Sequence, residues 1–151
     1  MAAVLGGLAF LVGCGAQERV NEQRPAPPVR ISVTIGPDAV TVQPRVVGIG
    51  PDRTQRIPQN VNAPQPPIRT DAPLTVAFVT ANLTEFDSRL EIVGPADTTS
   101  GPLVANGNGT YQADLPTGVY TISAADIPGA RPGRLTVGPY RASSQSDVLL
   151  P

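Results

Sequence analysis

Apolar and polar residues alternate in short runs along much of this chain. From Arg30 to Ile35 the alternation places Ile31, Val33 and Ile35 on one face, which predicts a β-strand with one buried side. The same period of two recurs at Val40 and Val42, Leu90 and Ile92, Tyr111, Ala113 and Leu115, Tyr120 and Ile122, and Leu135 and Val137. These runs predict short strands whose apolar residues share one core.

Three further segments add to this pattern. Leu74 to Ala81 is apolar on both faces, as expected for a central strand of a sandwich. The run NGNG at 106–109 supplies residues that tolerate positive φ and predicts a tight hairpin. Near the carboxyl end, the apolar run at 148–150 is either a last strand or a closing plug.

Helical periodicity does not persist anywhere for more than a turn or two. The pattern therefore predicts about seven or eight short strands separated by turns, which is typical of an all-β, antiparallel β-sandwich. We assign residues 29–151 to this domain, with a Pro-rich insertion at 51–73. The insertion has 23 residues with six prolines. It is either a tolerated surface loop or a polyproline II ligand for an aromatic groove.

The amino terminus has a different composition. Ala2 to Gly13 is an uncharged apolar run of 12 residues, too short to span a bilayer and of the length of a signal-peptide hydrophobic region. It ends in Leu11-Val12-Gly13-Cys14, which resembles the lipobox of bacterial lipoproteins. The resemblance implies a diacylglyceryl group on Cys14 and cleavage just before it. No Arg or Lys precedes the run, so either translation starts upstream of Met1 or the signal is weak.

These features predict a signal peptide at 1–13 and a lipidated Cys14 followed by a flexible tether, together 14–28. The tether is polar and Pro-rich, and its 14 residues after Cys14 would reach roughly 40 Å when extended. Two acyl chains hold a protein stably on a membrane, whereas one gives reversible binding. The expected location is therefore the extracytoplasmic face of the cell membrane.

The carboxy-terminal half contains the run LPTGVYTISAADIPGARPGRLTVGP. It resembles the last strand–loop–strand of cupredoxins, the small blue-copper sandwiches, and the likeness extends over residues 29–137, excluding the insertion. The resemblance places the family's first ligand histidine near Ser88, its cysteine near Ala124 or Ala125, and its second histidine at Ala130. A type 1 copper site needs two imidazoles and a thiolate, so the resemblance implies the scaffold without its electron-transfer chemistry.

An immunoglobulin-like sandwich is the alternative topology. Gly118-Val119-Tyr120 is similar to the tyrosine corner of those domains, and both topologies predict two packed sheets. The tyrosines are expected in the core or at corners, with their hydroxyls bonded to the backbone. Tyr140, between Pro139 and Arg141, is the one considered for a binding surface.

The amino-acid composition excludes most kinds of catalytic site. Histidine and lysine are absent and Cys14 is the single cysteine, so no imidazole base, Ser–Lys pair or internal disulfide is available. The carboxylate pairs Asp87 with Glu91 and Asp126 with Asp147 are expected to be solvated surface charge. We therefore expect no metal, no cofactor and no enzymatic activity.

The net charge limits the expected partners, and the choice of basic residues indicates the kind of genome that encodes the chain. A net charge of -1 argues against nucleic acid, and an all-Arg set of basic residues indicates a GC-rich bacterial genome, such as that of an actinobacterium. The expected function is that of a membrane-anchored lipoprotein acting as a non-catalytic binding or envelope structural module. Its expected partners are the membrane, through the lipid anchor, and an envelope protein or the cell wall. The alternative is an extracytoplasmic metal carrier or a carboxylate-dependent enzyme.

Overall fold

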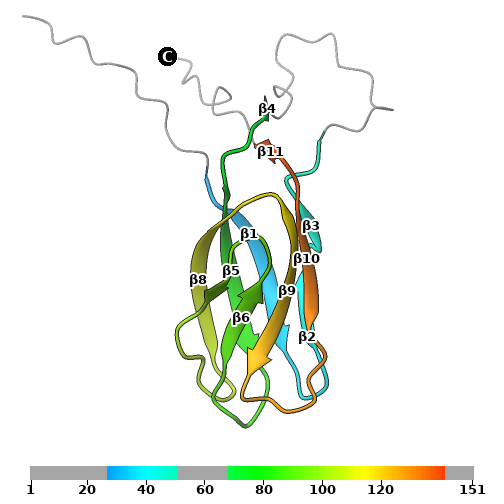
Figure 1. Ribbon diagram of the computed structural model, residues 1–151. Helices are drawn as coiled ribbons and strands as arrows, with labels where there is room; N and C mark the ends of the chain where they lie inside the picture. The colour runs from blue at the N-terminus through cyan, green and yellow to red at the C-terminus, as the bar shows by residue number, and fades with distance from the viewer. Residues whose placement is uncertain (1–26, 51–67, 142–151) are drawn as a thin grey trace, which may run out of the picture.

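The computed structural model describes residues 27–50 and 68–141, and within these it consists of strands joined by turns and loops (Figure 1). The strands are β1 (Val29–Ile35), β2 (Val40–Gln43), β3 (Val46–Val47), β4 (Ile68–Arg69), β5 (Leu74–Asn82), β6 (Arg89–Val93), β7 (Thr98–Thr99), β8 (Asn108–Leu115), β9 (Gly118–Ala125), β10 (Gly133–Val137) and β11 (Tyr140–Arg141). No membrane-spanning helix is found in these described parts.

Two sheets make up the body of the domain. Strands β2, β1, β5 and β8 form one sheet in that order, and β3, β10, β9, β6 and β7 form the second. The sheets pack face to face, so the predicted all-β sandwich is confirmed (Figure 1). Two pairings, β1 with β5 and β3 with β10, are parallel and not antiparallel as predicted. Between β1 and β5 the chain crosses to the second sheet and returns, and such a crossover lets two strands pair in the same direction.

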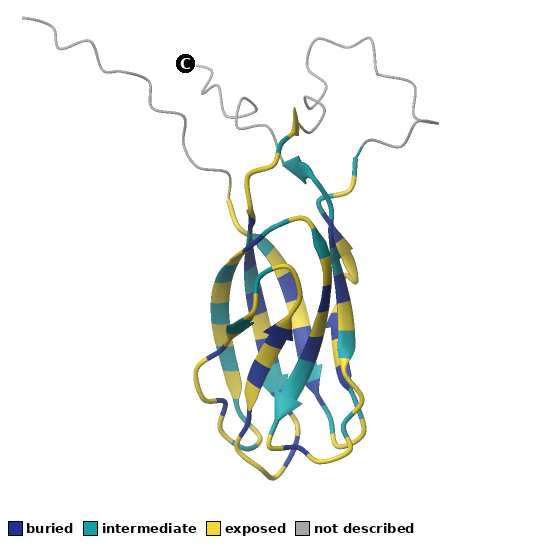
Figure 2. Cartoon of the chain, viewed as in Figure 1, coloured by how far each residue is buried: buried dark blue, intermediate teal, exposed yellow. Residues whose placement is uncertain are grey.

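The core lies between the sheets and is built from the inward residues of both (Figure 2). In β1 the predicted inward residues Ile31, Val33 and Ile35 are 1%, 1% and 0% exposed. The predicted alternation is also confirmed in β2, β6 and β10, and in the first part of β9. Each such aliphatic side chain contributes about 1.5–3 kcal/mol on full burial. The burial of these alternating residues is therefore the main source of stability.

Strand β5 lies inside its sheet, between β1 and β8, as predicted. Its two faces differ, however, because Val76 and Phe78 are 0% exposed whereas Val79 on the opposite face is 45% exposed. The expectation of an apolar strand covered on both sides was therefore wrong. In a two-layer sandwich each sheet packs on one face only, and the small residues of the other face meet solvent.

The predicted hairpin residues form a turn, but not a hairpin. Asn106 has a φ of 52°, and the Gly107 N–H donates to the Val104 carbonyl (3.1 Å). Leu103, before the turn, bridges to Ser88, whereas β8 after the turn pairs with β5. The turn therefore leads from the rim of one sheet into the edge strand of the other.

The last residues of the Pro-rich insertion belong to the folded domain. Strand β4 pairs antiparallel with β11, and the Arg141 guanidinium donates to the Ala72 carbonyl (2.5 and 3.0 Å). The preceding part of the insertion, 51–67, lies outside the described residues. The signal segment, the lipobox with Cys14 and the predicted last strand at 148–150 also lie outside them.

Candidate functional site

The two ends of the sandwich differ in the segments that lie there. At one end lie the points where the described segments start and stop (Figure 1). At the opposite end, which we call the loop end, four loops join the strands. They are the β1–β2 loop (36–39), the β5–β6 loop (83–88), the β7–β8 loop (100–107) and the β9–β10 loop (126–132).

Asn82, the last residue of β5, is fully buried at the loop end and joins two of these loops. Its Nδ2 donates to the backbone carbonyls of Phe86 (2.8 Å), Leu103 (3.3 Å) and Val104 (3.1 Å). Its Oδ1 accepts hydrogen bonds from the Thr84 N–H (3.2 Å) and hydroxyl (2.8 Å). A buried amide with both ends satisfied rigidifies the groups around it. Asn82 therefore holds the β5–β6 loop against the β7–β8 loop.

Two further bonds join the same loops. The Asn106 N–H donates to the Thr84 carbonyl (3.0 Å), and the Ala105 N–H donates to the Asp87 carboxylate (2.8 Å). The Asp87 carboxylate thus serves as an acceptor within the loop end. With the Asn82 contacts, these bonds make the two loops one connected body.

Three large apolar side chains of this body are exposed to solvent. Leu83, Phe86 and Val104 are 62%, 63% and 60% exposed, and we call them the apolar tip. A single exposed apolar residue is ordinary on a protein surface. Here, however, the backbones of Phe86 and Val104 bond to the same Asn82 amide. The tip is therefore held in place before any partner arrives, which lowers the ordering cost of binding.

A polar hollow lies at the same end of the sandwich. It is open, has a volume of about 320 Å³, and is lined by polar and charged residues together with one proline. The lining residues are Asp87, Ser88, Arg89, Ser100, Pro102 and Asp126.

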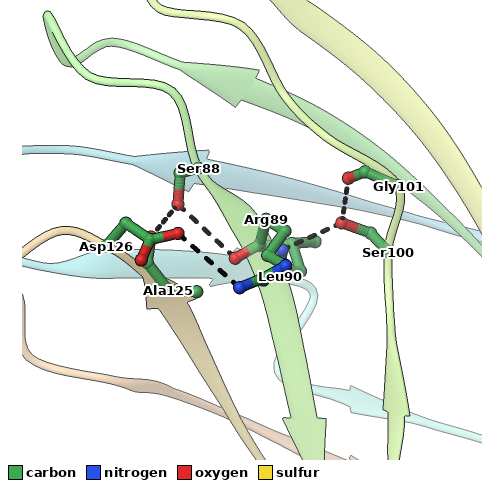
Figure 3. A network of polar contacts seen from close by, with 7 residues as sticks. All are labelled: Ser88, Arg89, Leu90, Ser100, Gly101, Ala125 and Asp126. Atoms are coloured by element: carbon green, nitrogen blue, oxygen red, sulfur yellow. Dashed lines mark hydrogen bonds and ion pairs between the residues drawn. The ribbon is translucent and has the colours of Figure 1, made fainter.

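Hydrogen bonds to the backbone occupy the hydroxyls of this hollow (Figure 3). The Ser88 hydroxyl donates to the Ala125 carbonyl (2.5 Å), and the Ser100 hydroxyl accepts the Leu90 N–H (2.9 Å). These bonds tie β6 to β9 and to the segment after β7. Both serine hydroxyls therefore take part in the hydrogen bonds that hold these segments together.

Charged groups of the hollow are solvated. Arg89 and Asp126 approach to 3.9 Å with side chains 53% and 66% exposed, a pairing that contributes little stability. Asp126 has a φ of 67°, a left-handed conformation that Asp tolerates better than most residues. Of the carboxylates considered as acid–base pairs, Glu91 is exposed on β6, and Asp147 lies outside the described residues.

The positions that the cupredoxin resemblance assigns to copper ligands are also at the loop end or next to it. Ser88 contacts Ala125 through the bond given above, and Ala124 pairs with Leu90 on the neighbouring strand. Ala130 lies in the β9–β10 loop, partly buried against the core. Over 27–50 and 68–141, no group of three His, Cys, Asp or Glu side chains is placed to hold a metal ion.

The three tyrosines have different environments. The Tyr120 hydroxyl donates to the Pro116 carbonyl (2.8 Å), as expected for a tyrosine corner, and burial raises the pKa of this phenol above its ordinary value of 10.0. The Tyr111 hydroxyl bonds to the Thr98 side chain and not to the backbone as expected. Tyr140 is half-buried and packs against the backbone of Gly50, at the end opposite to the loops.

Sequence reasoning did not select the residues of the apolar tip or Asn82. The available signal was local, namely an Asn at the end of a strand and a Thr two residues later, residue types that bond to nearby backbone. The Asn82 amide, however, bonds to the carbonyls of Leu103 and Val104, about twenty residues away in the chain. That partner choice is a tertiary property.

Comparison with known proteins finds similarity to a solved structure but no matching family. No protein-family model matches the chain, and no curated protein matches it. Among solved structures, a novel purple cupredoxin from Nitrosopumilus maritimus is similar at 18% identity with a TM-score of 0.39. The match covers 72% of this chain and 98% of the other. The assignment of a β-sandwich rests on the strand pairing itself.

Proposed function

We propose that this protein is a non-catalytic binding module of the bacterial envelope, and that its loop end contacts the partner. The observation that carries the proposal is the apolar tip, three exposed side chains on loops that the buried Asn82 fixes. When a partner covers apolar groups that are exposed to water, the free energy falls, and this favours binding. Because the loops are already ordered, little of that gain is lost on binding.

The proposed anchor is a lipid on Cys14, joined to the domain through the residues that precede β1. The lipobox-like run at 11–14 supports it. Strand β1 starts at Val29, at the end opposite to the tip (Figure 1). A tether attached there would direct the tip away from the membrane. This arrangement suits a partner in the envelope, such as an envelope protein or the cell wall, better than it suits the bilayer.

The charges around the tip favour the same choice. Glu85 and Asp87 flank Phe86 in the chain, and both are exposed. Carboxylates beside an apolar surface oppose insertion between anionic lipids. They favour a protein partner that offers an apolar patch with basic residues at its rim.

A metal carrier or a carboxylate-dependent enzyme remains the alternative and is weaker. Ser88, Ala124, Ala125 and Ala130 bring neither imidazole nor thiolate to the positions of the cupredoxin ligands. The Asp87 carboxylate already accepts the Ala105 N–H, and the Asp126 carboxylate faces Arg89. We therefore propose a cupredoxin-like scaffold used for binding and not for electron transfer.

Photo-crosslinking in the native envelope tests the tip. A photoreactive phenylalanine analogue replaces Phe86 in one variant and, as the control, Val93 in another, which is 53% exposed at the end of β6. We expect a discrete cross-linked protein from position 86 and none from position 93, measured by a mobility shift on a gel. Equal cross-linking from both positions, or none from either, would contradict the assignment of the loop end as the contact surface.

A further inference from the structure

Strand β8 forms a long free edge of the sandwich. Its eight residues pair with β5 on one side, and within 27–50 and 68–141 no strand pairs with the other side. The other edge strands of the two large sheets, β2, β3 and β7, have four, two and two residues. The β2 edge is also closed onto the second sheet, because the Val40 N–H donates to the Arg131 carbonyl (2.8 Å).

Two backbone hydrogen bonds at the end of the neighbouring strand β5 show which groups of β8 point outward. The Asn82 N–H donates to the Gly107 carbonyl (2.8 Å), whereas the next N–H, of Leu83, donates in the other direction to the Ile35 carbonyl (2.9 Å). Backbone groups alternate in direction along a strand, so the odd-numbered residues of β8 bond to β5. The even-numbered residues point their N–H and C=O groups outward, and these are Asn108, Thr110, Gln112 and Asp114.

Nothing in β8 protects this edge. Natural edge strands are protected by proline, by bulges or by clustered charge. Strand β8 pairs with β5 over eight successive residues without a bulge, contains no proline, and has Asp114 as its one charged residue. All four outward residues are exposed. The edge is therefore open to pairing with another strand.

We propose that two copies of this chain form a two-fold dimer by antiparallel pairing of β8 with β8. With the axis at Tyr111, Asn108 faces the second copy's Asp114 and Thr110 faces its Gln112, and the same pairs recur on the other side of the axis. Every outward residue then meets an outward residue, so each pair exchanges two backbone hydrogen bonds. The two four-stranded sheets become one continuous sheet.

The side chains suit this register. The Asp114 carboxylate lies opposite the Asn108 amide, a donor, and not opposite a second carboxylate. Thr110 and Gln112 form a neutral polar pair, and like charges directly opposite each other, which destabilise a sheet, do not occur. The edge is thus complementary to itself in hydrogen bonds and in charge, which is why a second copy is its occupant.

The dimer has a consequence for the anchored molecule. Antiparallel pairing puts the two apolar tips at opposite ends, so one tip points away from the membrane, as in a single chain, and the other faces it. The chain whose tip faces the membrane would start its tether at the far side. Strand β5, with nine residues, spans about 30 Å, and a 14-residue tether would reach roughly 40 Å. Both proposed anchors would therefore reach one membrane.

A proline substitution tests the backbone pairing. The N–H of Thr110 points away from β5, so Thr110→Pro removes two hydrogen bonds of the dimer, one from each copy, and none inside the sandwich. Thr110→Val keeps the N–H and the branched shape and is the matched control. For the full chain in mild detergent, we expect light scattering to give a dimer mass for the unsubstituted chain and for Thr110→Val. Thr110→Pro should weaken association by roughly tenfold to a hundredfold.

A charge exchange tests the register independently of proline. Asn108→Asp places two carboxylates opposite each other on both sides of the axis and should weaken association by about tenfold. Adding Asp114→Asn removes the facing carboxylate and should restore it. The circular dichroism of every variant should match that of the unsubstituted chain, since both residues are exposed.

Three results would overturn the proposal. One is a monomer mass for the unsubstituted chain at every soluble concentration. Another is a dimer that neither Thr110→Pro nor Asn108→Asp weakens, because that dimer would use another surface. The third is a mixed complex in which Thr110→Pro releases a different protein, because the edge would then bind a foreign strand. None of these results bears on the apolar tip, which the cross-linking at Phe86 tests separately.

Discussion

At the scale of single residues, Asn82 has the largest structural role at the candidate site. Its side chain is 0% exposed and satisfies three carbonyl oxygens and the Thr84 N–H and hydroxyl. A substitution that leaves buried carbonyls without donors costs far more than the loss of one solvated hydrogen bond. The order of the apolar tip therefore depends on one amide group that takes no part in the contact with a partner.

We predict that Asn82→Ala lowers the free energy of unfolding by about 3 kcal/mol. It should also increase hydrogen exchange of the backbone at 83–86, because the loop loses its ties. Glu91→Ala is the control, since Glu91 is exposed on β6, lies outside the proposed β8 interface, and its change should stay within about 0.5 kcal/mol. Urea unfolding measures both values. An Asn82→Ala variant as stable as the control would mean that the loop end is held by other contacts.

At the scale of elements, the small β4–β11 pair limits the extent of the Pro-rich insertion. Ile68–Arg69 pairs with Tyr140–Arg141, and Arg141 donates to the Ala72 carbonyl. The insertion predicted at 51–73 therefore ends in structure that closes the sandwich at the end opposite to the loops. Only its first part is a candidate for removal.

We predict that deleting residues 54–63 leaves a cooperatively folded domain with stability changed by about 1 kcal/mol or less, because closure entropy varies slowly with loop length. Deleting 52–72 should lower stability further, since it also removes β4 and the acceptor of Arg141. Thermal unfolding followed by circular dichroism compares the two. Equal loss of stability in both variants would show that residues before Ile68 also stabilise the fold.

At the scale of the whole molecule, the sandwich separates the proposed anchor from the proposed contact surface. Strand β1 starts at one end and the apolar tip lies at the other (Figure 1). This separation matters only if Cys14 carries the lipid. We predict that mass spectrometry of the native polypeptide will find a chain starting at Cys14 with a diacylglyceryl thioether. A free thiol at Cys14 with Met1 still attached would contradict the anchor and leave the fold unaffected.

For the strands with alternating apolar and polar residues, the sequence by itself determined which residues face the core. Alternation in β1 and in β10 is a local property, because side chains on a strand point to opposite faces in turn, and it placed Ile31, Val33, Leu135 and Val137 correctly. The tyrosine corner was predictable for the same reason, since the Tyr120 hydroxyl bonds only four residues away. The two-sheet fold class follows from many such short strands.

Only the tertiary structure decided which strands are neighbours. Alternation does not say that β1 pairs in parallel with β5, that β8 is left as an edge, or that Asn82 bonds to Leu103 and Val104. Each of these features involves strands or residues far apart in the chain. It therefore depends on how the whole core packs and not on the neighbouring residues in the sequence. The apolar tip and the open edge of β8 both arise at that level.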